Sequence, residues 1–131
     1  MATVLGIGGF FFRAKDPETL ARWYADHLDV TEVPQDYDSP VWRQSGGTTV
    51  FAPFQHDTDY FGDPEKQWMI NFRVDDLDGM IARLEEAGIA VERNEDAFPN
   101  GRFVRLADPE GNPIELWEPA GSARECEERR G

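Results

Sequence analysis

Two segments of the chain repeat one another sixty positions apart. GFFFRAKD begins at Gly9 and MINFRVDD begins at Met69, and they end at Asp16 and Asp76. Their shared apolar residues alternate with other residues, which is typical of a strand with one face on a core. A repeat of this kind indicates two copies of one supersecondary unit, and this limits the possible folds more than any other feature.

A helix is predicted directly after each repeated strand. Asp16 can cap the first helix and Pro17 takes its first position, while Gly88 is a natural end for the second. Shorter strand signals follow each helix, separated by turn sequences such as Gly46-Gly47 and residues 108–112, DPEGN. The sequence therefore predicts an α+β fold, in which two tandem βαβββ modules form a cleft or an incomplete barrel.

The length of 131 residues suits one domain. We expect a single domain, 1–119, made of modules 1–54 and 68–119 that a connector, 55–67, joins. The connector is rich in aromatic residues, so it could be a lid on the cleft or a dimer contact. The remaining residues, 120–131, form a polar tail that we expect to be disordered.

The charge of the chain excludes several partners. With 13 basic and 26 acidic residues the net charge is −13, which repels nucleic-acid phosphates and anionic lipids. No apolar run is long enough to cross a membrane. The single cysteine excludes an internal disulfide and fits a reducing compartment. We therefore predict a cytoplasmic protein with neither nucleic acid nor membrane as a partner.

Three stretches together resemble the vicinal oxygen chelate superfamily, which includes glyoxalases, bleomycin-resistance proteins and extradiol dioxygenases. They are FFFRAKDPETLARWYADHLDV (10–30), INFRVDDLDGMIARLEEAGIAV (70–91) and DPEGNPIELWEP (108–119). The resemblance covers about residues 4–119. It implies paired βαβββ modules around a pocket, often in a homodimer. It does not imply one reaction, because fold and function separate readily.

Catalytic members of this superfamily hold a divalent metal in the cleft. The resemblance carries the ligand positions over to Gly9, Val50, Met69 and Glu115. Only the last offers a good donor, whereas a catalytic site needs about three protein ligands. The only histidines, His27 and His56, are not at a spacing that predictably brings them to Glu115. We therefore expect neither a metal nor another cofactor.

Strand alternation assigns side chains to the cleft. The predicted ligand-binding residues are Phe11, Met69, Asn71, Phe103, Arg105 and Trp117. An apolar pocket with a few polar groups is typical of small-molecule sites. Glu115 also turns inward and is the candidate catalytic residue, because an inward carboxylate is costly unless it is paired. We expect it to pair with Arg105 and anchor a ligand; unpaired, it could act as a general base.

Three functions follow from these observations. The first is metal-independent binding of a small, partly aromatic organic molecule by a homodimer. The second is a metal-dependent lyase, isomerase or dioxygenase that uses a displaced site. In the third, the cleft is filled by the protein's own side chains and the protein works through dimer contacts. The sequence leaves open whether the protein is an enzyme.

Overall fold

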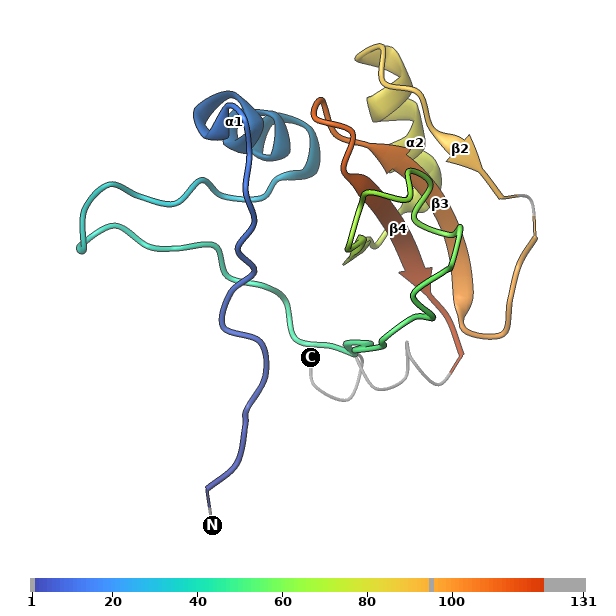
Figure 1. Cartoon of the computed structure of the whole chain (residues 1–131), viewed down its shortest axis with the longest axis horizontal. Helices are drawn as coiled ribbons and strands as arrows, with labels where there is room; N and C mark the ends of the chain where they lie inside the picture. Colours follow the sequence, from blue (N-terminus) through green and yellow to red (C-terminus); the bar gives the residue numbers. More distant parts are fainter. Residues whose placement is uncertain (1, 95, 122–131) are drawn as a thin grey trace.

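The computed structural model describes residues 2–94 and 96–121 and has the predicted α+β class (Figure 1). Its regular elements are α1 (Pro17–Leu28), β1 (Ile70–Arg73), α2 (Leu77–Glu86), β2 (Glu92–Arg93), β3 (Gly101–Ala107) and β4 (Pro113–Pro119). Neither helix of this described part is long and apolar enough to span a membrane.

The second half of the chain is a complete βαβββ unit, as predicted. Its sheet has the strand order β1-β4-β3-β2. β1 runs parallel to β4, whereas β3 is antiparallel to both β4 and β2. The two parallel strands are joined through α2, β2 and β3, because parallel neighbours need a long crossover.

The first helix begins as the sequence predicts, and the second begins with the same kind of cap. The side chain of Asp16 accepts a hydrogen bond from the Thr19 amide at 3.2 Å, and Asp76 accepts one from the Gly79 amide at 3.0 Å. α2 ends before Gly88, whose φ of 81° lies in the left-handed region that glycine adopts without strain. Long-range contacts add to these local caps, since the Leu77 amide at the start of α2 donates to Glu118 Oε1 at 2.9 Å.

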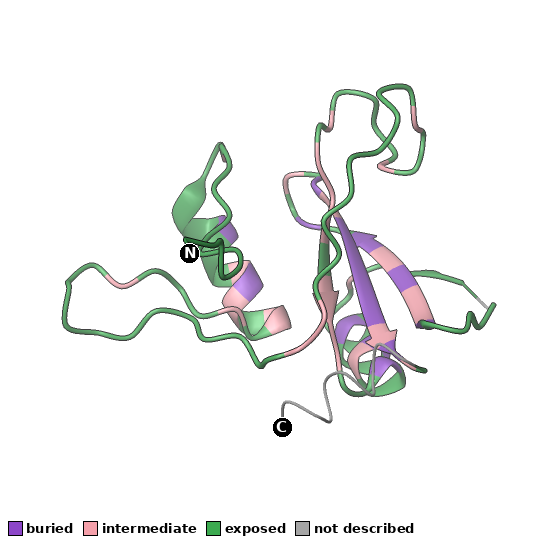
Figure 2. Ribbon diagram, turned by 90° about the horizontal axis from the view of Figure 1, so that it is seen from below, coloured by how far each residue is buried: buried purple, intermediate pink, exposed green. Residues whose placement is uncertain are grey.

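The core lies between one face of the sheet and the two helices. It consists of Leu20, Tyr24, Leu77, Ile81, Leu84, Val104, Leu106, Ile114 and Leu116. Figure 2 shows that the buried residues gather in α2, β3, β4 and the inner side of α1. Alternation along the strands points Val104 and Leu106 of β3, and Ile114 and Leu116 of β4, to the core.

The first half of the chain differs from the second. It contributes α1, but the expected strands over 9–16 and around Gly46-Gly47 do not form, and no strand occurs among residues 2–69. Figure 1 shows long extended runs there instead. Alternation favours an extended chain, but a strand also needs a hydrogen-bonded neighbour. Apolar side chains therefore stay exposed, with Phe11 92% and Val50 69% accessible.

The DPEGN turn between β3 and β4 holds α1 in place. The hydroxyl of Tyr24, on α1, donates to Asp108 Oδ2 at 2.6 Å. Asp108 Oδ1 also accepts from the backbone amides of Glu110 and Asn112, at 2.8 and 3.0 Å. The Glu110 carboxylate accepts from the amides of residues 15–16 at 2.7 and 3.0 Å. Burial, followed by the bond to Asp108, raises the pKa of the Tyr24 hydroxyl above its ordinary value.

The predicted tail, 120–131, lies outside the described residues apart from its first two positions.

Candidate functional site

One register row of polar side chains crosses all four strands on the sheet face opposite the core. Asn71 of β1 is the partner of Glu115 of β4, which is also the partner of Arg105 of β3. Arg105 in turn faces Glu92 of β2. Register partners point to the same face of a sheet, so these side chains can form one network.

Glu115 is the buried centre of this row, with 8% of its surface exposed. The side-chain amide of Asn71 donates to its Oε1 at 2.6 Å, and the hydroxyl of Tyr60 donates to its Oε2. Both carboxylate oxygens are therefore satisfied, which offsets the cost of burying the charge.

Arg105 does not form the ion pair that the sequence suggested. Its Nη2 donates to Glu92 Oε1 at 2.8 Å, and its Nη1 donates to the backbone carbonyl of Tyr60. The pKa of Arg105 is raised above its ordinary value, first by the hydrogen bond to Glu92. The guanidinium thus links β3 to β2 and to the connector, and the expected Arg105–Glu115 pair is corrected.

Tyr60 brings the connector into contact with the polar row of the sheet. The guanidinium carbon of Arg105 lies 4.7 Å from the centre of its ring, and Phe54 stacks on it with centroids 6.0 Å apart. Desolvation, then the bond to Glu115, raises the pKa of Tyr60 to about 12, so the hydroxyl keeps its proton at neutral pH. Figure 1 shows this green connector crossing in front of β3 and β4.

A pair of stacked aromatic rings lies beside the polar row. Phe103 and Trp117 are register partners, and their rings are nearly parallel, at 5° with centroids 5.9 Å apart. The indole nitrogen of Trp117 donates to the carbonyl of Asn100 at 2.8 Å, which fixes the ring. The buried Trp117 ring and the half-buried Phe103 ring thus lie next to the hydrogen-bonding groups of the row.

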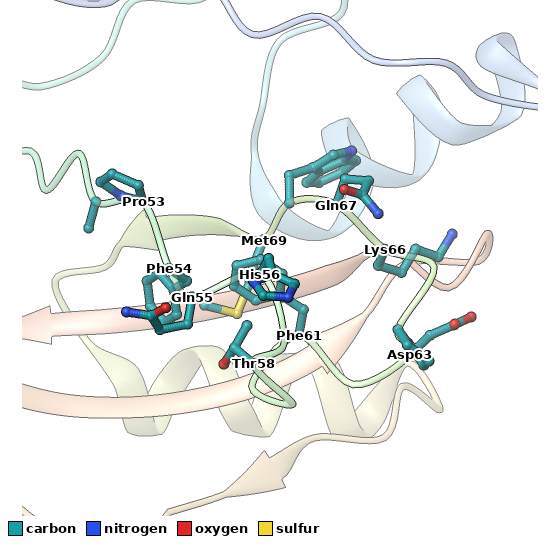
Figure 3. Close-up of a pocket in the computed structure, with 13 residues that line it drawn as sticks. Pro53, Phe54, Gln55, His56, Thr58, Phe61, Asp63, Lys66, Gln67 and Met69 are labelled. Atoms are coloured by element: carbon teal, nitrogen blue, oxygen red, sulfur yellow. The ribbon is translucent and has the colours of Figure 1, made fainter.

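Two hollows flank the connector. The first has a volume of about 400 Å³, and its wall includes Met69, around which Phe54 and His56 gather (Figure 3). The second, of about 680 Å³, opens toward β2 and β3 and is lined in part by Tyr60, Glu92 and Arg105. Phe61 and Asp63 line both hollows, so this part of the connector separates them.

The structure places most of the predicted site residues together. Asn71, Arg105 and Glu115 share one register row, and Phe103 pairs with Trp117 in the next row on the same face. Met69 lines the first hollow. The remaining predicted residue, Phe11, is on the exposed first half instead. Tyr60 and Glu92 were missed, although the aromatic character of the connector was a signal for the former.

The positions that the resemblance assigns to metal ligands offer few donors. Gly9 and Val50 are exposed and offer no donor, Met69 offers a thioether, and both Glu115 oxygens already accept hydrogen bonds. In the part of the chain that the structure describes, no three His, Cys, Asp or Glu side chains are grouped to hold a metal ion.

Solved structures share this fold. TnmS3, an antibiotic binding protein from Streptomyces sp. CB03234, aligns over 92% of this chain and 100% of its own, with 23% identity and a TM-score of 0.60. A glyoxylase/bleomycin resistance protein/dioxygenase domain from Frankia sp. EAN1pec aligns over 89% and 99%, with 20% identity and a TM-score of 0.58. At sequence identities this low, structural similarity is evidence for a shared fold only.

Sequence comparison extends the likeness. The uncharacterized protein YaeR of Escherichia coli (strain K12) is 40% identical over 48 residues, which is 36% of this chain and 37% of YaeR. The glyoxalase-like domain model matches residues 9–117, and thus spans both repeated segments and the site row. On this evidence the chain belongs to the glyoxalase-like domain family.

Proposed function

We propose that this protein binds a small, partly aromatic organic molecule between the connector and the polar face of the sheet, without using a metal. The main support for this proposal is that Glu115 is a buried carboxylate beside the stacked rings of Phe103 and Trp117. Such a combination can hold a ring by stacking and orient it through one charged hydrogen bond. Binding, and hence sequestration, is the minimum activity.

The comparison with TnmS3 supports this proposal by analogy. That protein is an antibiotic binding protein with the same fold. A shared fold does not transfer a ligand, because function depends on the site that the fold carries. Antibiotics with aromatic parts are therefore one ligand class to test, beside aromatic metabolites, and we place the binding activity in the cytoplasm.

Glu115→Gln should weaken ligand binding, because it keeps the shape of the side chain and removes its charge. Thermal shift against a panel of aromatic metabolites and antibiotics identifies the ligands, since binding to the folded state raises the melting temperature. For each of them we expect calorimetry to show a loss of about 1–3 kcal/mol, roughly 5- to 150-fold in Kd.

Glu86→Gln is the matched control for this experiment. Glu86 is an exposed carboxylate at the end of α2, on the helix side of the sheet, so its replacement should leave Kd unchanged. Unchanged binding by Glu115→Gln would give Glu115 a structural role only. A panel in which no compound raises the melting temperature would contradict the binding function itself.

We also propose that the protein is a homodimer. Large apolar side chains of the first half are exposed, among them Leu5, Phe11, Val50 and Phe51. Patches of this kind usually mark an interaction surface, and a second copy would cover them. Light scattering at micromolar concentration should give twice the chain mass of 14.9 kDa. A single-chain mass under these conditions would contradict the proposal.

A further inference from the structure

Glu115 already has two donors, and one of them comes from the connector. The Asn71 amide, which belongs to the sheet, occupies Oε1, while the Tyr60 hydroxyl occupies Oε2. A ligand that donates to this carboxylate must therefore replace a donor that is present. Tyr60 is the one that can leave, because it lies in a loop rather than in a strand ladder.

The surroundings of the Tyr60 side chain are those of a bound phenol. Its hydroxyl donates to the Glu115 carboxylate. The guanidinium carbon of Arg105 lies 4.7 Å from the centre of its ring, and the Phe54 ring stacks on it with centroids 6.0 Å apart. These contacts recognise the acidic hydroxyl, the electron-rich face and the flat shape of a phenol. Each would serve a phenolic ligand as well as it serves Tyr60.

We propose that Tyr60 occupies a phenol-binding site of this protein, and that phenolic ligands bind by displacing it from Glu115. This inference rests on the proposed function and deepens it, because it names phenols as the ligand class. Tyr60 is then a positioning residue that holds the connector closed while the site contains no ligand.

Few contacts hold the connector near Tyr60. Its backbone hydrogen bonds are local, from Thr58 to Gln55, from Gly62 to Asp59 and from Lys66 to Asp63, each at 3.0 Å. Tyr60 contacts the sheet through its hydroxyl, its carbonyl and its ring, over which the Arg105 guanidinium lies. Further along the connector, Lys66 Nζ donates to the Glu110 carbonyl and to Asn112 Oδ1, each at 3.3 Å. Tyr60 is also 36% exposed, although its hydroxyl contacts Glu115, which is 8% exposed. Segments with so few contacts open at low free-energy cost.

Displacement of Tyr60 would also create room. The hollows of about 400 and 680 Å³ are separated by Phe61 and Asp63, which follow Tyr60 in the chain. Their separation depends on the connector lying where the Tyr60–Glu115 bond holds it. With this bond broken, the two spaces can join above the polar row and accept a molecule larger than a single ring.

The occupied site has a measurable consequence for affinity. The apparent Kd of a ligand equals its intrinsic Kd divided by the fraction of protein that is competent to bind. Because Tyr60 competes with the ligand, Tyr60→Ala should bind 4-methylphenol, the side-chain analogue of tyrosine, at least about tenfold more tightly than wild type. Calorimetry with purified full-length protein measures both constants.

Three comparisons make this test specific. Toluene lacks the hydroxyl and should bind Tyr60→Ala more weakly than 4-methylphenol does. The double variant Tyr60→Ala/Glu115→Gln should lose the increase in affinity for 4-methylphenol that Tyr60→Ala has over wild type. Tyr37→Ala, which removes a fully exposed tyrosine, should behave as wild type. The inference would be overturned if Tyr60→Ala bound 4-methylphenol and toluene equally well. It would also be overturned if Tyr60→Ala and wild type bound 4-methylphenol with equal affinity.

Hydrogen exchange tests displacement in the wild-type protein. Saturating 4-methylphenol should speed the exchange of the amides of Gly62 and Lys66, and unchanged exchange at saturation would overturn the inference. If Tyr60→Ala does not fold, Tyr60→Phe keeps the ring and removes only the hydroxyl. Its affinity for 4-methylphenol should then rise roughly 3- to 10-fold, and an unchanged affinity would count against displacement.

The two proposals can fail separately. If compounds from the panel bind the wild-type protein in a way that depends on Glu115, but Tyr60→Ala leaves all affinities unchanged, the phenol site is wrong and the binding function stands. If no compound from the panel binds at all, the binding function itself is contradicted.

Discussion

Asp108→Ala is expected to lower the free energy of unfolding by about 3 to 5 kcal/mol. The buried carboxylate accepts from the Tyr24 hydroxyl and from the backbone amides of Glu110 and Asn112. Alanine removes all of these acceptor contacts and leaves buried donors without a partner, which is more costly than removing a hydrogen bond with both its partners. Urea unfolding followed by tryptophan fluorescence measures the loss.

Tyr24→Phe provides the matched control, because it removes one of these donors and leaves the carboxylate in place. We expect it to cost about 1 to 2 kcal/mol. The difference between the two variants isolates the role of Asp108 in shaping the DPEGN turn. Equal losses would show that the turn forms without this carboxylate and that Asp108 serves only the hydroxyl of α1.

Leu116→Ala should destabilise the protein by about 2 to 5 kcal/mol. Leu116 is fully buried in β4, where its side chain packs into the core between both helices and the sheet. The same truncation at an exposed position, Val50→Ala, should change stability by no more than about 0.5 kcal/mol. Similar losses from both variants would contradict the contrast in burial between the two halves of the chain.

The site was predictable where it depends on strand alternation. Ile114 and Leu116 alternate with Glu115 and Trp117 in the sequence. This alternation assigns the first two residues to the core face of the sheet and the other two to the opposite face. The DPEGN turn makes β3 and β4 sequential neighbours, and this brings Arg105 opposite Glu115. Local patterns are sufficient here because a strand has only two faces.

The partners of these residues were not predictable in the same way. Arg105 lies between two carboxylates in the register row, and its bond to Glu92 depends on the pairing of the short strand β2. The contact of Tyr60 with Glu115 depends on the path of a loop, which has no periodicity to indicate direction. In the first half, alternation predicted strands that do not form, because the hydrogen-bonded neighbour that a strand needs is a tertiary property.

The position of the strand ladders also affects how the protein is made. Within the described residues, every ladder lies between Ile70 and Pro119, and α1 is held by Asp108. A ribosome completes α1 at Leu28 and must add 108 − 28 = 80 further residues before Asp108 exists, which takes roughly 4 to 16 s at cellular elongation rates. During this delay the apolar face of α1, which includes Leu20 and Tyr24, lacks the core residues of β3 and β4 against which it packs. The speed of translation therefore sets how long this face of the helix stays uncovered.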